Sequence, residues 1–151
     1  METAKLTARA SIQIQKSPQA VYEAIVDPAL MSNYFISKGS GIMEEGQTVI
    51  WRFPEFDMEF PVEIVKTEKF KQIHFIWGQG DQKALVEIAL EAFKKDTVVK
   101  IVEHEPARNE AGISWAIGQT EGWSYFLAGL KAFLDHNVRL REGAFAYRFV
   151  G

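Results

Sequence analysis

The sequence has 151 residues, of which 47% are hydrophobic and 25% are charged, a balance typical of one soluble globular domain and not of a disordered or fibrous chain. The net charge of -3 and the dispersed lysines give no general attraction to phosphate backbones, so we expect no nucleic-acid partner. The absence of cysteine excludes disulfides, thiol catalysis and cysteine-ligated metals.

The first predicted elements are a strand and two short helices. Apolar and polar residues alternate from Leu6 to Gln15, which predicts a half-buried strand. Ser17 and Pro18 are an N-cap residue and a proline at the first helical position, and they open a helix over "PQAVYEAIV". A second short helical turn is predicted from residue 27 through about residue 34.

The middle of the chain is predicted to form an antiparallel meander. Segments rich in β-branched and aromatic residues alternate with short polar or glycine-bearing breaks, which suit hairpins. Glycines 39, 41 and 46 mark the loop before the meander, and Pro106 to Gly112 form the polar connector after it. The predicted strands lie near Gln47–Phe53, Phe56–Glu68, Gln72–Gly78, Lys83–Phe93 and Thr97–Glu105.

The last predicted element is a helix from about Ser114 to Val138, which would be about 37 Å long at 1.5 Å per residue. Large apolar residues at spacings of three and four form one stripe that we expect to face the sheet. Ala128 and Gly129 lie beside this stripe, so another element could approach the helix backbone closely. The stripe consists of Trp123, Phe126, Leu127, Leu130, Phe133 and Leu134.

This order of elements resembles the helix-grip fold of the SRPBCC or START-like superfamily. Within it, the chain is most similar to the family named for the C-terminal domain of the activator of heat-shock-protein-90 ATPase. The segments that carry the resemblance are "SPQAVYEAIVDPALMSNYF", "EIVKTEKFKQIHFIW", "TVVKIVEHE" and "EGWSYFLAGLKAFL".

The resemblance implies an α+β fold in one domain, residues 1–151. In this fold a curved antiparallel sheet of six or seven strands wraps around the long C-terminal helix, and two short helices follow the first strand. The residues after Arg141, "EGAFAYRFVG", lie beyond the usual end of the family and form a tail that could add an edge strand.

Aromatic residues dominate the expected interior between sheet and helix. Those on three predicted strands share one face opposite the helix stripe, and Tyr34 and Phe35 would close one end. Such a cleft suits a small apolar or amphipathic molecule, such as a lipid, although the same side chains could instead fill the space with one another. The candidate ligand-binding residues are Tyr34, Phe35, Trp51, Phe53, Met58, Phe60, Phe75, Trp77, Ile101, Glu103, Trp123, Leu127 and Leu130.

Glu103 is the polar group that the strand pattern would direct into this interior if Val99 and Ile101 face the helix. The period of two along a strand places it on the same face as Val99 and Ile101. A carboxylate there needs a partner or a proton, so Glu103 could orient the polar end of a ligand or act as an acid or base. The alternative is a solvent-exposed position at the rim of the sheet.

No catalytic or metal-binding motif accompanies these residues. His104 alternates with Glu103 and Glu105 along the predicted strand, so one ion cannot collect all three side chains. The glycine pairs at 39–41 and 78–80 lack the context of a dinucleotide loop, and no serine lies in a nucleophile elbow. We therefore expect no catalytic residue, no metal and no cofactor.

The sequence also bears on the cellular location and the oligomeric state of the protein. It has no signal-peptide pattern and no run of 18 apolar residues, so we expect a cytoplasmic protein that does not enter a membrane. Phe145, Tyr147 and Phe149 alternate in the tail, where they could bind a partner or a second copy, or pack back on the domain. A monomer and a homodimer both remain open.

Three functions fit this sequence. The leading prediction is a binding domain for a small hydrophobic or amphipathic ligand. The second is a chaperone-regulating interaction module that acts through its outer surface, as the family name implies. The third is an enzyme, because relatives in the superfamily include cyclases and hydrolases.

Overall fold

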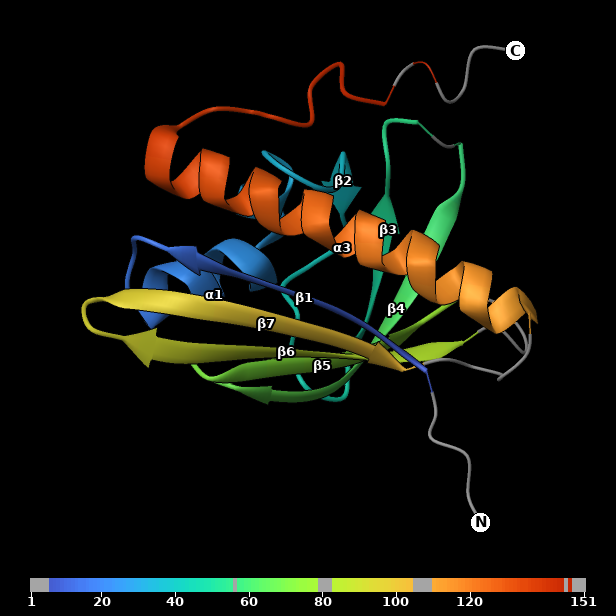
Figure 1. The fold of residues 1–151 in the computed structure, drawn as a ribbon, viewed down its shortest axis with the longest axis horizontal. Helices are drawn as coiled ribbons and strands as arrows, with labels where there is room; N and C mark the ends of the chain where they lie inside the picture. Colours follow the sequence, from blue (N-terminus) through green and yellow to red (C-terminus); the bar gives the residue numbers. More distant parts are fainter. Residues whose placement is uncertain (1–5, 56, 79–82, 105–109, 146, 148–151) are drawn as a thin grey trace.

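The computed structural model describes residues 6–55, 57–78, 83–104, 110–145 and 147. A seven-stranded antiparallel sheet forms one layer, and the long helix α3 (Glu110–His136) crosses over it as a second layer (Figure 1). This is the predicted α+β helix-grip fold. The strands are β1 (Thr7–Ile14), β2 (Lys38–Gly39), β3 (Thr48–Arg52), β4 (Glu59–Glu68), β5 (Gln72–Trp77), β6 (Ala84–Phe93) and β7 (Asp96–His104).

The sheet order is β1-β7-β6-β5-β4-β3-β2, so the first strand pairs with the last and the remaining strands follow one another as a meander. The strand that the sequence did not predict is β2, where Lys38 and Gly39 pair with Arg52 and Trp51 of β3. Gly39 fits there because a Cβ atom at this position would lie only 2.7 Å from Cβ of Pro28. The seventh strand therefore comes from the glycine-bearing loop, and the described residues 142–145 of the tail form turns and a bend instead of an edge strand.

Two short helices follow β1, as predicted. Helix α1 (Pro18–Val26) begins with Ser17, whose side chain accepts a hydrogen bond from the Ala20 N–H at 3.3 Å. Helix α2 (Pro28–Met31) is shorter than the predicted 27–34, because the chain continues from Ser32 in turns.

Helix α3 begins at Glu110, four residues before the predicted start, and ends at His136. Asn137 ends it by adopting a positive φ of 54°. Its predicted stripe faces the sheet: Trp123, Phe126, Leu127 and Leu130 are buried, and Phe133 and Leu134 are partly buried against the same core. Among the helices of the described chain, none combines the length and apolar character that a membrane crossing requires.

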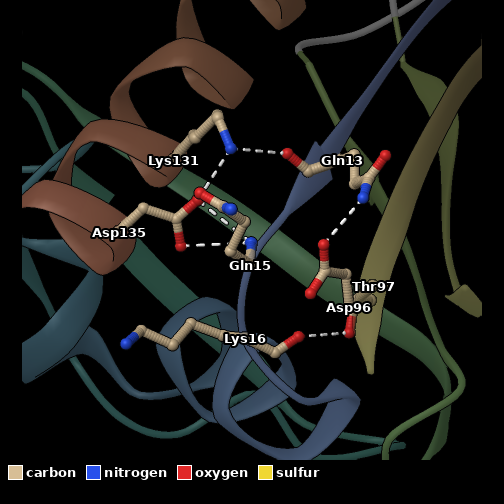
Figure 2. A network of polar contacts seen from close by, with 7 residues as sticks. All are labelled: Gln13, Gln15, Lys16, Asp96, Thr97, Lys131 and Asp135. Atoms are coloured by element: carbon tan, nitrogen blue, oxygen red, sulfur yellow. Dashed lines mark hydrogen bonds and ion pairs between the residues drawn. The ribbon is translucent and has the colours of Figure 1, made fainter. Parts of the chain in front are cut away.

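A polar clamp formed by Gln13, Gln15, Lys131 and Asp135 ties the end of β1 to the last turns of α3 (Figure 2). The Asp135 carboxylate accepts the backbone N–H of Gln15 at 3.0 Å and the Lys131 ammonium at 2.7 Å. Lys131 also donates to the carbonyl oxygen of Gln13 at 2.9 Å. The clamp thus fixes the C-terminal half of the helix on the sheet.

Candidate functional site

Aromatic rings occupy the interior between the sheet and α3. The ring of Trp51 lies edge-on to Phe75 and Trp77, with centroids 5.4 and 5.9 Å apart. Trp123, from the helix, has its ring centroid 5.6 Å from that of Trp77. At these separations the rings contact one another, so in the described part of the chain they pack together.

The predicted ligand-binding residues fall into three groups. Most of them are buried in or against this interior. Phe60 and Trp77 are half-buried, and Met58 is 47% exposed. Met58 precedes Glu59, where pairing of β4 with β3 begins, so it belongs to the connection and the structure does not bring it to the interior. The buried ones are Tyr34, Phe35, Trp51, Phe53, Phe75, Ile101, Glu103, Trp123, Leu127 and Leu130.

Glu103 lies inside the protein and not at the rim of the sheet, with 1% of its surface exposed. Its Oε1 accepts hydrogen bonds from the Trp123 indole N–H at 2.8 Å and the Gln119 amide at 2.7 Å. Its Oε2 accepts the Trp77 indole N–H at 2.7 Å. Since an ionised carboxylate is a pure acceptor, three N–H donors satisfy it, and it joins β5 and β7 to α3.

A second candidate site lies at the end of the interior that Tyr34 and Phe35 close. A pocket of about 510 Å³, which we call the tail pocket, opens between the turns after α2, the β3–β4 connection and the chain after α3. The sequence predicted two of its residues as ligand contacts, Tyr34 and Phe35. The tail pocket is lined by residues 32–37, Pro54, Glu55, Arg139, residues 141–143 and Phe145.

Phe35 separates the tail pocket from the aromatic interior. Its ring centroid lies 4.8 Å from that of Phe126 and 6.1 Å from that of Trp123 on the interior side. The Arg141 guanidinium lies 5.7 Å from the centroid of Phe35 on the pocket side. A molecule in the tail pocket would therefore contact a ring that packs directly on the core.

Arg141 is the main polar residue of the tail pocket, and the sequence did not predict its role. Its guanidinium lies over the rings of Phe53 and Phe145, at 5.7 and 5.0 Å from their centroids, and it forms a 2.7 Å ion pair with Glu55. The side chain of Glu55 is only 10% exposed, and that of Arg141 is 21% exposed. A local pattern could not reveal this pair, because its members are 86 positions apart.

Two other polar pairs lie on the sheet, and their members do not line the tail pocket. Arg52 pairs with Glu59 at 2.5 Å, and both side chains are about half exposed. His104 contacts Glu87 on the face of the sheet opposite Glu103. Within the described residues, no group of three or more histidine, aspartate or glutamate side chains is placed to hold a metal ion.

Comparison with known proteins identifies the family. The family model described as Activator of Hsp90 ATPase homolog 1-like protein (AHSA1) matches residues 15–135. The chain belongs to the AHSA1 family. Protein SSP2350 from Staphylococcus saprophyticus, whose crystal structure is known, shares 30% sequence identity with this chain. The two structures align with a TM-score of 0.80 over 90% of this chain and 96% of SSP2350. No curated protein shows significant similarity to the sequence.

Two further solved structures share the AHSA1 fold. DynU16, a protein of the dynemicin biosynthetic locus, is 22% identical with a TM-score of 0.78, and the match covers 88% of this chain but only 48% of DynU16. The Aha1 dimer from Colwellia psychrerythraea is 18% identical with a TM-score of 0.75, over 87% of this chain and 97% of that one. At these identities the likeness establishes the fold alone. Because the AHSA1 match ends at residue 135, Arg141 and Phe145 of the tail pocket lie outside it.

Proposed function

We propose that this AHSA1 domain binds a small apolar or amphipathic molecule in the tail pocket, against Tyr34 and Phe35. The observation that carries the proposal is the pocket itself. Its volume of about 510 Å³ lies within the range of small-molecule sites. Its walls combine the aromatic side chains of Tyr34, Phe35 and Phe145 with polar and charged residues, which suits an amphipathic molecule.

The tail pocket is a better location for the ligand than the surroundings of Glu103. There, each carboxylate oxygen already accepts hydrogen bonds from the protein, and a ligand would have to displace packed rings. We do not propose catalysis at Glu103, because its partners are indole and amide N–H groups, which do not exchange protons as acids or bases near neutral pH.

A thermal-shift screen against fatty acids, fatty amides, sterols and aromatic metabolites tests the proposal. At least one class should raise the melting temperature in a saturable way, because a ligand that binds only the folded state stabilises it. Absence of any saturable shift would contradict the proposal.

Matched variants then locate the site. Ser32 lines the tail pocket, and its hydroxyl donates to the Ala29 carbonyl oxygen in α2. Ser124 makes the same kind of bond to Thr120, but on the exposed face of α3. Ser32→Trp should abolish the shift by filling the pocket, and Ser124→Trp should retain it. Equal shifts in both variants would place the ligand elsewhere.

The second candidate function is chaperone regulation through the outer surface. It is favoured by the family, and by Ile113 and Ile117, which lie one turn apart on α3 and are 53% and 68% exposed. In this case the protein should change the ATPase rate of an Hsp90-class chaperone, and Ile117→Ser should reduce the effect. An unchanged rate over a wide range of protein concentrations would exclude the role.

A further inference from the structure

We propose that Glu55 and Arg141 recognise the polar head of the ligand, and that they select an uncharged carboxamide or lactam attached to an apolar body. This inference rests on the proposed binding function of the tail pocket. It adds the chemical class of the ligand and names the residues that bind its polar head.

The ion pair between Glu55 and Arg141 forms only one of the two hydrogen bonds that these groups can make with each other. A guanidinium and a carboxylate can form two parallel hydrogen bonds, but here only Arg141 Nη2 and Glu55 Oε1 are joined, at 2.7 Å. Glu55 Oε2 and Arg141 Nε are both buried, and neither has a hydrogen-bond partner within the described chain. The pair therefore retains one buried acceptor and one buried donor.

Such atoms are unusual in folded proteins, because a buried polar group without a partner carries the full desolvation cost of that group. Glu55 and Arg141 both line the tail pocket, and the two atoms themselves have almost no accessible surface. A ligand that supplies both a donor and an acceptor would satisfy Glu55 Oε2 and Arg141 Nε together once the two side chains turn toward the pocket. A carboxamide carries an N–H donor and a carbonyl acceptor on neighbouring atoms, so it can bond to both.

The charges around the tail pocket favour a neutral head group. Its charged lining residues are two arginines and two glutamates, so their formal charges cancel. Arg139 is also engaged with Asn33, to whose side-chain oxygen it donates at 2.8 Å. An anionic head would face the Glu55 carboxylate and a cationic head would face Arg141, whereas a neutral amide avoids both repulsions.

The chain after α3 holds Arg141 in this position. The ring of Phe145 packs edge-on against Tyr125 of α3, with centroids 5.0 Å apart. The backbone N–H of Ala144 donates to the carbonyl oxygen of Arg141 at 2.9 Å, in a turn where Gly143 has a φ of 75°. Phe145 and Phe35 supply apolar walls for the body of the ligand, beside the polar pair.

The test compares three probes that share one apolar body, namely 4-butylbenzamide, 4-butylbenzoate and 4-butylbenzylamine, titrated into the whole chain by NMR. The amide should bind at least about tenfold more tightly than either charged probe, the difference expected from one hydrogen bond to a charged group. Equal affinities, or tighter binding of a charged probe, would overturn the inference. Because this comparison needs no substitution, it stands even if a variant fails to fold.

Substitution of Glu55 tests directly whether this residue selects the head group. Glu55→Gln leaves Arg141 without its counter-charge. The affinity for the amide should therefore fall about tenfold while the affinity for the benzoate rises, so that the benzoate becomes the tighter binder of the two. Glu59→Gln is the matched control, because it removes a carboxylate from the exposed pair with Arg52 outside the tail pocket. It should leave the order unchanged. An unchanged order in Glu55→Gln would overturn the assignment of the head-group site.

The outcome also separates the two proposals. If all three probes bind equally and Ser32→Trp abolishes their binding, the tail pocket is a ligand site but the amide selectivity is wrong. If none of the probes binds and the screen also gives no saturable shift, the binding function itself is wrong.

Discussion

The hydroxyl of Tyr34 donates a hydrogen bond to the carbonyl oxygen of Ala24 at 2.8 Å. In a longer helix this carbonyl would accept the N–H of the residue four positions on, but that residue is Pro28, which has no N–H. Tyr34 therefore supplies the donor that the sequence removes at the end of α1. Because Tyr34 also lines the tail pocket, the bond fixes one of its walls.

Removing this hydroxyl should destabilise the protein. Tyr34→Phe keeps the ring against Phe126 and Phe133 but leaves the Ala24 carbonyl buried without its donor. We expect a loss of about 1–2 kcal/mol in the free energy of unfolding, measured by urea denaturation. Tyr125→Phe is the control and should have little effect, because Tyr125 is 47% exposed. Equal stability of Tyr34→Phe and the unsubstituted chain would show that the bond contributes nothing.

Glu103→Gln tests the carboxylate that joins the sheet to α3. The new amide would direct its own N–H group at one or more of the N–H donors of Trp77, Gln119 and Trp123, so a buried donor loses its acceptor. The free energy of unfolding should fall by about 2 kcal/mol, and tryptophan fluorescence should change because two indoles lose a charged partner. Glu63→Gln, at an exposed position of β4, should change neither quantity. Ligand binding in the tail pocket should persist in both folded variants.

The polar clamp predicts how stability depends on pH. Burial alone would raise the pKa of Asp135, but the hydrogen bonds from Gln15 and Lys131 and the charge of Lys131 lower it below its ordinary value. A carboxyl group whose pKa is lower in the folded than in the unfolded state adds stability above its unfolded pKa. That stability is lost as the pH falls through the folded pKa. The contribution should therefore begin to fall near about pH 4, the ordinary pKa of an aspartate, and should be lost progressively as the pH falls further through the folded pKa.

Asp135→Asn should lower the free energy of unfolding at pH 7 by about 1–2 kcal/mol, because it weakens two hydrogen bonds to the carboxylate. Between pH 7 and pH 3 the variant should also lose less stability than the unsubstituted chain. The control is Asp96→Asn, which removes the carboxylate that accepts a 2.7 Å hydrogen bond from the Gln13 side chain but leaves the bonds of the clamp intact. If Asp135→Asn keeps the full acid dependence, the clamp is not its source.

Periodicity predicted the parts of the structure that depend on local geometry. The stripe on α3 faces the sheet because its spacing follows the helical repeat, and Glu103 points inward because side chains alternate along a strand. The two-residue strand β2 and the pair of Glu55 with Arg141 could not be predicted in this way. The strand β2 has only two residues, too few to show a period, and Glu55 and Arg141 are 86 positions apart, so their contact depends on how loops fold back on the domain.

The glycines of α3 allow a direct test of close packing. A Cβ atom at Gly129 would lie 3.1 Å from the carbonyl oxygen of Tyr34, which is tighter than an ordinary contact. Tyr34 cannot easily move away, because its hydroxyl is bonded to Ala24 and its ring packs on Phe126. A Cβ atom at Gly122, in the same helix, would meet no atom of the described chain within 4 Å.

The two alanine substitutions should therefore have opposite signs. In Gly122→Ala the only change is the higher helix propensity of alanine, so the free energy of unfolding should rise by about 0.5–1 kcal/mol. In Gly129→Ala the same gain is offset by overpacking, which typically costs about 1–3 kcal/mol, so the net effect should be a loss. Urea denaturation of both variants measures the difference. If Gly129→Ala were as stabilising as Gly122→Ala, Tyr34 would not be held against the helix as tightly as its contacts indicate.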